Sequence, residues 1–400
     1  MFFSGATVNA VACRAGAIWD EGYLGYDFGD HPLNPVRLDL TIRLARSLGV
    51  LDRLDMRTAS VAGEDQLLTT HDAAYLAAVR EASTNPNFSG FGLGTSDDPV
   101  FPGMYDVSAL IAGGSADAAM MVWRGETEHA VNIAGGLHHA MRGYAAGFCV
   151  FNDVVLAIRA LLAGGAKKVA YVDIDVHHGD GVQAAFYDDA RVLTISLHQD
   201  PRTLFPGTGF ATEVGDGAAI GTAANVALPP GTNDRDWLRA FHAVVPSLVK
   251  AFAPDVLVTQ CGCDTHHEDP LASLELTVDG QRTAIAALHT LAHEAAGGRW
   301  VAFGGGGYGL IRCVPRTWTH LLAEASGVRV PPETPIPVEW SDHLRSRGVT
   351  GQLPSTMGEM AAPTLDPWQP GGEGWLDAAI GATRRAVFPY HGLDPDDPRD

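Results

Sequence analysis

Five short apolar runs in this chain each end in a cluster of polar residues or glycines. The runs are rich in β-branched residues without polar alternation, which is typical of strands buried on both faces of a parallel sheet. They are Ala130–Ala134, Lys168–Ile174, Val192–Leu197, Val256–Thr259 and Trp300–Phe303. Segments with helical spacing lie between them. The chain is therefore expected to be an α/β protein with a mostly parallel central sheet and helices on both faces.

Helical spacing is clearest in two segments. Apolar residues recur on one face from Trp237 to Phe252, and again from Leu40 to Leu51 after Pro35. In a parallel α/β sheet, ligands bind beyond the carboxyl ends of the strands. The polar clusters after the five runs are therefore expected to converge on one site.

The composition changes near residue 327, where prolines and glycines become frequent and apolar periodicity fades. We expect a single catalytic domain over residues 1–326. Residues 327–400 are expected to form a Pro/Gly-rich extension: a meandering surface segment, a short helix around Leu376–Val387 and a frayed acidic tail.

Charge and cysteine content restrict the partners and the compartment. Acidic residues outnumber basic ones 47 to 27, giving a net charge of −20, which argues against nucleic acid or an anionic membrane as the main partner. No run of eighteen apolar residues predicts a membrane span, and the start, Met1-Phe-Phe-Ser-Gly, lacks the pattern of a signal peptide. Five cysteines do not indicate a disulfide framework. A cytoplasmic location is expected.

The densest group of chemically active side chains runs from Asp173 to Asp180. On a strand, residues i and i+2 project to one face, so Asp175 and His177 can both reach one cation. A carboxylate with an imidazole suits Zn²⁺ or another first-row divalent metal. Asp264 is the best third ligand, and three ligands leave a position open for water or substrate. The alternative is a polar strand end with hydrogen-bonded side chains, which the crowding disfavours.

A second group is the pair His138-His139, which follows a strand and a Gly-Gly turn. One ring could act as a general base and the other as a general acid. Each would need a carboxylate on its far nitrogen, and Asp173 and Asp180 are available. A surface histidine pair is the alternative.

The third group is Gly304-Gly-Gly-Gly-Tyr308-Gly309. It matches a dinucleotide-binding pattern, with Glu324 near the position of a ribose-binding acid, but Glu324 lies in a helical stretch and this is the last strand of the series. Tyr308 could instead donate its hydroxyl to a developing oxyanion. The alternative is a glycine turn with a packed tyrosine. Cys261 and Cys263 are interpreted as buried cysteines.

Together these motifs resemble the zinc-dependent histone deacetylase family, which has the arginase–deacetylase fold, and within it the bacterial acetoin-utilisation deacetylases. The resemblance extends from about Tyr26 to His320. The motifs that carry it are His31–Arg37, Gly135–His139, Gly147–Asp153, Asp173–Gly181, Phe205–Gly209, Gly262–His267 and Gly304–Tyr308.

The resemblance implies a role for each of these groups. Asp175, His177 and Asp264 match the metal ligands, with Zn²⁺ expected and Fe²⁺ as the alternative. His138 and His139 match the tandem acid/base pair, partnered by Asp173 and Asp180 respectively, and which histidine is the base stays open. Tyr308 matches the residue that polarises the acetyl carbonyl.

The resemblance also implies a substrate tunnel and further sites. Phe148 and Phe205 match its aromatic walls, and Gly147 and Gly306 also match substrate-binding positions. Either Asp97 or Asp98 matches a rim aspartate, and Arg37 matches an arginine of an acetate-release cavity. Two structural K⁺ sites are implied, one formed by Asp173, Asp175, His177, Ser196 and Leu197 and the other by Phe186, Asp189 and Val192.

One position bears on the substrate. Polyamine-selective relatives carry a gatekeeper glutamate seven residues after the third ligand, where this chain has Leu271. Leucine favours acyl-lysine in a protein over an acetylpolyamine, although Glu268 lies nearby. A departure from the nuclear members is Leu137, where they carry a bulkier aromatic residue.

The sequence thus predicts metal-dependent hydrolysis of N-ε-acetyl-lysine in an acetylated cytoplasmic protein, with acetyl-CoA synthetase as the expected type. The alternatives are a deacetylase of acetylpolyamines or other small-molecule amides, and an acetyl-lysine binding module without activity. An arginase-like hydrolase would need more carboxylates for two manganese ions. The oligomeric state stays open.

Overall fold

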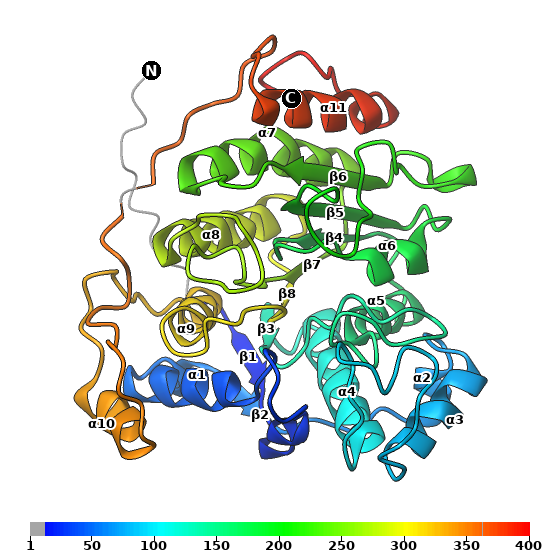
Figure 1. The fold of residues 1–400 in the computed structure, drawn as a ribbon. Coiled ribbons are helices and arrows are strands. Elements are labelled where there is room, and N and C mark those ends of the chain that lie inside the picture. The colour runs from blue at the N-terminus through cyan, green and yellow to red at the C-terminus, as the bar shows by residue number, and fades with distance from the viewer. Residues whose placement is uncertain (1–12, 362) are drawn as a thin grey trace.

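A parallel eight-stranded sheet forms the centre of the described residues, which are 13–361 and 363–400 of this computed structural model (Figure 1). The first twelve residues, from which we expected no signal peptide, lie outside these ranges. The strand order is β2 (Asp55–Arg57), β1 (Ala15–Ile18), β3 (His129–Asn132), β8 (Trp300–Phe303), β7 (Val256–Gln260), β4 (Val169–Asp173), β5 (Val192–Gln199) and β6 (Ala223–Leu228).

Helices cover both faces of this sheet (Figure 1). One layer consists of α1 (Val36–Ser47), α9 (Val314–Ser326), α8 (Val278–Ala295) and α7 (Asp234–Phe252). The other contains α4 (Met104–Trp123), α5 (Asp153–Ala163) and α6 (Asp180–Phe186), with the short α2 (Glu64–Leu67) and α3 (Ala73–Ala82) beside α4. The predicted α/β class is therefore confirmed.

The five predicted strands are present as β3, β4, β5, β7 and β8, and every residue in them is buried. The sequence reading missed β1, β2 and β6. β1 has only four residues, most of them small, and β6 is half alanine. β2 is a three-residue edge strand with two exposed charged residues, so it carries little of the signal of a buried strand.

The two predicted helices are α7 and α1. In α7, the side chain of Asn233 caps the first turn by accepting from the backbone N–H of Asp236, and the apolar face packs into the core. The predicted continuation of α1 to Leu51 is wrong. The helix ends at Ser47, and Gly49 turns the chain with φ of 70°, so Leu51 begins a separate 3-10 turn (Leu51–Arg53).

The segment after residue 327 is more ordered than a meandering surface chain. It contains α10 (Val338–Ser346), which packs against α1. Trp340 is buried, and its indole N–H donates to the carbonyl of Leu40 over 2.9 Å. Trp340, Leu344 and Met357 form a second apolar cluster with α1. The prediction of an irregular segment missed α10. The apolar side of this short helix packs against α1, which lies about 300 residues earlier in the chain.

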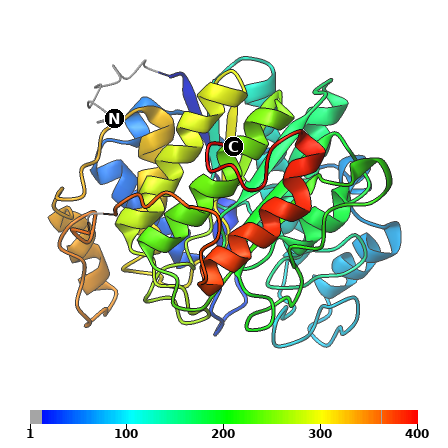
Figure 2. The same cartoon turned by 90° about the horizontal axis from the view of Figure 1, so that it is seen from above.

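The predicted helix near the C-terminal end is α11 (Trp375–Val387), and it packs against β6 and α7 (Figure 2). The predicted fraying of the acidic tail is wrong. Arg384 of α11 is fully buried and donates to the backbone carbonyls of Asp394, Pro395, Asp397 and Asp400. A buried guanidinium needs acceptors for its N–H groups, and the tail supplies them.

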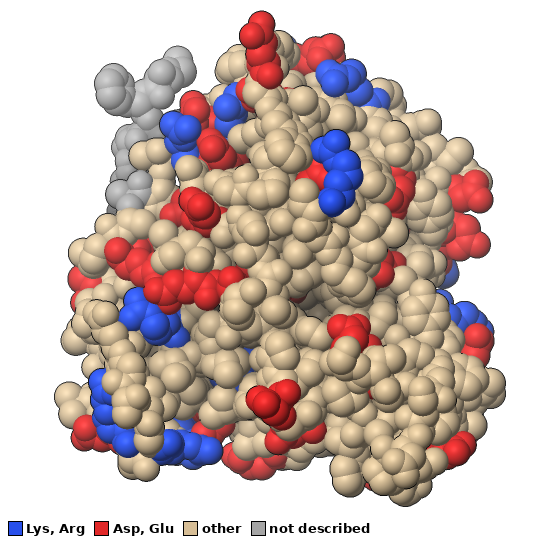
Figure 3. Space-filling model, viewed as in Figure 1, with Lys and Arg blue, Asp and Glu red and all other residues tan. Residues whose placement is uncertain are grey.

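Charged side chains are scattered over the face of the molecule shown in Figure 3, with both signs interspersed. Among the described helices, none combines the length and the hydrophobicity needed to span a membrane.

Candidate active site

The polar clusters that follow β3, β4, β7 and β8 meet at the carboxyl edge of the sheet. They surround a small cavity of about 10 Å³ whose lining includes His138, His139, Asp175, His177 and Tyr308. The strands are parallel, so their carboxyl ends lie at the same edge. The predicted convergence of these motifs thus follows from the order of the strands.

Asp175, His177 and Asp264 form a compact buried triplet. Nδ1 of His177 lies 3.1 Å from Oδ1 of Asp175 and 3.2 Å from Oδ2 of Asp264. One donor atom from each of the three residues lies within 4.8 Å of the others. β4 and β7 are neighbours with Asp173 opposite Gln260, and this register brings the two loops together.

The electrostatics of the triplet suit a cation. Burial, together with the neighbouring Asp175, raises the pKa of Asp264 to about 8, because two buried carboxylates repel each other. A divalent ion between them would remove this penalty, and two oxygens with one imidazole nitrogen suit Zn²⁺ or Fe²⁺. Gly306 leaves the space free, since a Cβ there would lie 1.9 Å from Oδ2 of Asp264. The residues present therefore fit a metal ion.

His138 and His139 each face a carboxylate and also face each other. Nδ1 of His138 lies 2.7 Å from Oδ2 of Asp173, and Nδ1 of His139 lies 2.7 Å from Oδ1 of Asp180. The two Nε2 atoms are 3.0 Å apart. All four side chains are buried. The carboxylate beside each ring keeps a hydrogen on its Nδ1 atom. The two Nε2 atoms are therefore the ones that can exchange a proton.

The two rings differ in proton affinity. Burial alone would lower the pKa of His138, but the carboxylates of Asp173 and Asp175 outweigh it and raise this pKa to about 9. Burial, assisted by the neighbouring His138, lowers the pKa of His139 to about 4. The pair therefore holds one proton between the two facing Nε2 atoms, a state suited to taking up and releasing protons.

Tyr308 lies at the end of the glycine turn, and two groups hold it there. Its backbone N–H donates to Oδ2 of Asp269 over 2.8 Å. Arg37 is buried and donates to the carbonyls of Gly305 and Gly307. Burial raises the pKa of Tyr308 well above its ordinary value, so its hydroxyl remains a hydrogen-bond donor.

Sequence reasoning assigned no role to three residues that support this site. Tyr171 donates its hydroxyl to Oδ2 of Asp173 over 2.5 Å, and Gln260 donates its amide to Oδ2 of Asp175 over 2.7 Å. Asp153 accepts from the backbone N–H groups of Gly136 and Leu137, just before the histidine pair. The i, i+2 spacing of Tyr171 and Asp173 on one strand was a usable signal. The contacts of Gln260 and Asp153 depend on tertiary structure.

Two phenylalanines lie beside the cavity. The Phe148 ring packs edge-on against Tyr308 with centroids 5.6 Å apart, and the Phe205 ring packs against His139 at 5.0 Å. Phe205 is exposed and Phe148 half-buried, as at the mouth of a cavity. Gly147 has φ of 56°, and a Cβ there would lie 2.4 Å from the His139 ring, so only glycine fits.

Comparison with known proteins identifies the family of this fold and site. A family model described as the histone deacetylase domain matches residues 31–325, which include all the residues around the cavity. The chain belongs to the histone deacetylase family. The comparisons thus support a deacetylase enzyme with the arginase–deacetylase fold.

Relatives of this histone deacetylase family member include bacterial proteins of similar length. The chain is 40% identical to the acetoin utilization protein AcuC of Bacillus subtilis (strain 168), with 81% of this chain and 84% of that protein covered. It is 34% identical to AcuC of Staphylococcus xylosus, with 81% and 86% covered. A crystal structure of an HDAC homolog complexed with SAHA matches with a TM-score of 0.79 and 30% identity, over 92% of this chain and 100% of that one.

The sequence did not decide whether Asp97 or Asp98 is the rim aspartate, and the two side chains differ in burial in this structure. Asp97 is half-buried and accepts from the backbone N–H of Gly147 over 2.9 Å, so it lies beside Phe148 at the mouth. Asp98 is buried, and burial together with Asp97 raises its pKa to about 8. Of the two, Asp97 is thus the one whose side chain is partly exposed, and its role at the rim stays a prediction.

Leu271 is linked to Tyr308 through Asp269 in this deacetylase-family site. Asp269 accepts from the backbone N–H groups of both Leu271 and Tyr308. Glu268, the other acidic residue nearby, pairs with Arg312 over 2.8 Å. Its charge is therefore partly balanced by an arginine.

The residues named for potassium lie in two groups. Asp173 is opposite Ser196 in the β4–β5 pairing, with Leu197 next along the strand and Asp175 and His177 beyond the end of β4. Phe186 ends α6 and Val192 begins β5, and Asp189 in the turn between them is joined to both by backbone hydrogen bonds. Potassium at either group stays a prediction, as does a role for Arg37 in acetate release.

Proposed function

We propose that this chain is a metal-dependent lysine deacetylase that hydrolyses the acetyl amide of N-ε-acetyl-lysine in a protein and releases acetate. The observation that carries the proposal is the meeting of two buried histidine–carboxylate pairs, the Asp175–His177–Asp264 triplet and Tyr308 around one cavity. A binding module would have no use for two proton-transfer pairs beside a candidate metal triplet.

Asp175, His177 and Asp264 would hold the metal ion, with Zn²⁺ expected and Fe²⁺ as the alternative. When bound, such an ion supplies Lewis-acid chemistry, which activates water and polarises a carbonyl group. Gln260 and the backbone N–H of Gly306 both donate to Oδ2 of Asp175 and so orient that carboxylate.

The histidine pair moves the protons. One imidazole accepts a proton from the attacking water as its oxygen bonds to the acetyl carbon. The C–N bond of the tetrahedral intermediate then breaks, and an imidazolium of the pair donates a proton to the departing lysine nitrogen. Asp173 and Asp180 stabilise the positive charge on these rings during both transfers.

Tyr308 would stabilise the developing oxyanion by donating its hydroxyl hydrogen to the former carbonyl oxygen. Phe148 and Phe205 would pack against the apolar stem of acetyl-lysine, and Asp97 would accept a hydrogen bond from the substrate backbone. Each of these three residues lies beside the cavity or its mouth.

An acetylated protein is favoured over an acetylpolyamine as substrate. A polyamine substrate would bring a second cation to the gatekeeper position, where this chain has an apolar leucine, and the nearby Glu268 already pairs with Arg312. We propose a cytoplasmic acetylated enzyme of the acetyl-CoA synthetase type as the natural substrate.

The test is hydrolysis of an acetyl-lysine peptide and of N-acetylspermidine by the purified protein, before and after chelation and after Zn²⁺ or Fe²⁺ is restored. We expect peptide hydrolysis that chelation abolishes and metal restores. Preferential hydrolysis of N-acetylspermidine would support the small-molecule alternative. Peptide binding without turnover in metal-loaded protein would overturn the enzymatic assignment and leave the acetyl-lysine binding module.

A further inference from the structure

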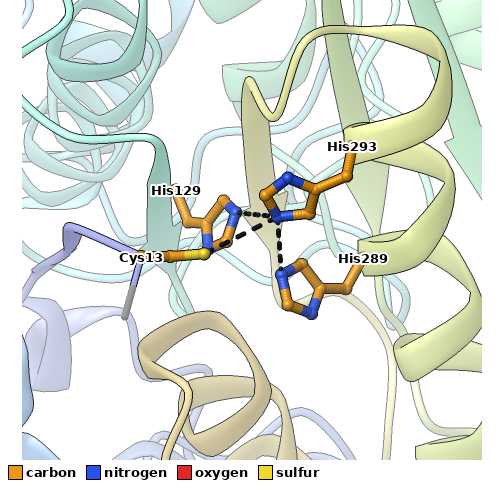
Figure 4. Close-up of side chains that lie close together, drawn as sticks. All are labelled: Cys13, His129, His289 and His293. Atoms are coloured by element: carbon orange, nitrogen blue, oxygen red, sulfur yellow. Dashed lines mark hydrogen bonds between the residues drawn. The ribbon is translucent and has the colours of Figure 1, made fainter. Parts of the chain in front are cut away.

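A second cluster of metal-ligating side chains lies outside the candidate active site. It consists of Cys13, His129, His289 and His293, whose donor atoms all lie within 4.8 Å of one another (Figure 4). Nε2 of His293 is 3.2 Å from Nε2 of His129, 3.0 Å from Nε2 of His289 and 3.6 Å from Sγ of Cys13. Three imidazoles and a thiol thus converge on one point.

The cluster is assembled from three separate parts of the fold. Cys13 lies just before β1, His129 is the first residue of β3, and His289 and His293 are one turn apart on α8 (Figure 4). His138 and His139 follow the other end of β3. The cluster therefore lies at the amino edge of the sheet, opposite the candidate active site.

The hydrogen bonds around the rings leave their Nε2 lone pairs facing inward. Nδ1 of His129 lies 2.8 Å from the carbonyl oxygen of Ala325, which only accepts, so this Nδ1 carries the hydrogen. Nδ1 of His289 likewise faces the Glu324 carboxylate at 2.7 Å. In their neutral forms both rings therefore present an Nε2 lone pair to Nε2 of His293. A single hydrogen on His293 can be donated to only one of them.

A metal ion would satisfy all these lone pairs at once. Around a tetrahedral Zn²⁺, with Zn–N of ~2.0 Å and Zn–S of ~2.3 Å, ligand atoms lie roughly 3.3–3.6 Å apart. The separations from Nε2 of His293, 3.0 to 3.6 Å, are close to this range. The Glu324 carboxylate and the Ala325 carbonyl behind two of the imidazoles are partners that metal-bound histidines commonly have.

An ion could reach the cluster from outside. Cys13, His289 and His293 line a surface cavity of about 510 Å³, and His293 is exposed while His129 is buried. By contrast, another group, His266, His267 and Glu359, already has a cation, because Arg316 pairs with Glu359 over 2.6 Å. The cysteine–histidine cluster is thus the stronger candidate for a metal.

We propose that Cys13, His129, His289 and His293 form a second transition-metal site that binds Zn²⁺ through one thiolate and three imidazoles. With four protein ligands the site is closed, as structural zinc sites are. It would tie Cys13, just ahead of β1, to β3 and α8. Its ligands are distinct from those of the candidate active site, so this proposal does not depend on the proposed deacetylase activity.

Zinc content tests the site directly. Full-length protein is saturated with Zn²⁺, dialysed, and analysed for bound zinc per chain. We expect Cys13→Ser and His293→Gln each to hold one equivalent less than the wild type. The matched control, His242→Gln on α7, should hold as much as the wild type. Both test positions are at least partly exposed, so folded variants are expected, and circular dichroism checks this.

Cobalt distinguishes the two sites, because the Asp175–His177–Asp264 triplet contains no sulfur. With Co²⁺ in place of Zn²⁺, the wild type and Asp175→Asn should both show a thiolate-to-cobalt charge-transfer band in the near ultraviolet. Cys13→Ser should lose it. A wild type without the band, a Cys13→Ser variant that retains it, or a His293→Gln variant with undiminished zinc would overturn the proposal. Loss of metal from Asp175→Asn alone would bear only on the deacetylase site.

Discussion

Single hydrogen bonds decide where protons lie in the candidate site. Asp173 and Asp180 each hold the Nδ1 hydrogen of one histidine, and Tyr171 and Gln260 in turn donate to Asp173 and Asp175. Every one of these groups is buried. In such surroundings an unpaired polar atom is costly, so each side chain is limited to one orientation.

Tyr308→Phe removes the hydroxyl while leaving the ring that packs against Phe148. We expect kcat for an acetyl-lysine peptide to fall about 10²- to 10³-fold, the usual cost of losing one oxyanion donor. Metal content should stay unchanged, because Tyr308 is not among the proposed ligands. Steady-state kinetics and metal analysis check both, and an unchanged kcat would remove Tyr308 from the mechanism.

Leu271→Glu tests the gatekeeper position. A carboxylate at position 271 could pair with the second amine of an acetylpolyamine, and an added ion pair is worth up to about 1 kcal/mol. We expect the ratio of kcat/KM for N-acetylspermidine to that for acetyl-lysine peptide to rise about fivefold. Leu271→Gln, of similar size without the charge, is the control. An equal change in both variants would show that shape and not charge acts here.

At the scale of elements, the start of α5 connects the loop that contains His138 and His139 to a turn that contains His71. The side chain of Asn152 caps α5 and donates to the carbonyls of His138 and Ala140. Its backbone N–H donates to Nε2 of His71, whose Nδ1 donates to the carbonyl of Met141. His71 must therefore be neutral to hold this helix start beside the histidine pair.

The His71 contacts predict acid sensitivity. Burial lowers the pKa of His71 to about 4, below its ordinary value of 6.5. Between pH 4 and 6.5 the unfolded chain binds a proton on His71 more tightly than the folded chain does. The contribution of neutral His71 to the free energy of unfolding is therefore fully present above pH 6.5 and is lost as the pH falls toward 4. The loss is on the order of 3 kcal/mol. The free energy of unfolding, measured with urea, should fall less steeply below pH 6.5 in His71→Gln than in the wild type. Between pH 7 and 8 the difference between the two proteins should stay constant.

On the scale of the whole molecule, the residues after 327 complete the fold. α10 covers α1 at one end of the molecule, and α11 with the tail covers β6 and α7 at the other (Figures 1 and 2). Both contacts include a buried polar group with its partner, namely the Trp340 indole on Leu40 and the Arg384 guanidinium on the tail. The extension thus contributes to the core, and we propose that the catalytic unit includes it.

Arg384→Gln tests this contribution. Losing the guanidinium removes the donor that contacts the buried carbonyl of Ala243 on α7 and the carbonyls of four tail residues. We expect the free energy of unfolding to fall by about 3 kcal/mol. The neighbouring Arg385 is exposed and provides the control. Arg385→Gln should change the free energy of unfolding by less than about 0.5 kcal/mol. Equal urea midpoints for the two variants would mean that the tail adds nothing to stability.

The sequence by itself determined the strands buried on both faces and the residues that follow them. Five strands were predictable, because a short continuous run of β-branched residues is typical of a strand buried on both faces. They are β3, β4, β5, β7 and β8. The clustering of His138, Asp175 and Asp264 followed, since parallel strands bring their carboxyl ends to one edge. The resemblance added a role for each residue. The family match shows the histone deacetylase family, and the roles of single residues stay predictions.

Only the tertiary structure decided which distant residues meet. The register that brings Gln260 to Asp175, the tail carbonyls that surround Arg384 and the convergence of Cys13 with His129 and His293 each join segments far apart in the chain. Local patterns describe which face of a segment is apolar. They contain no information on which polar side chains become neighbours, because that depends on the packing of helices and strands from separate parts of the chain.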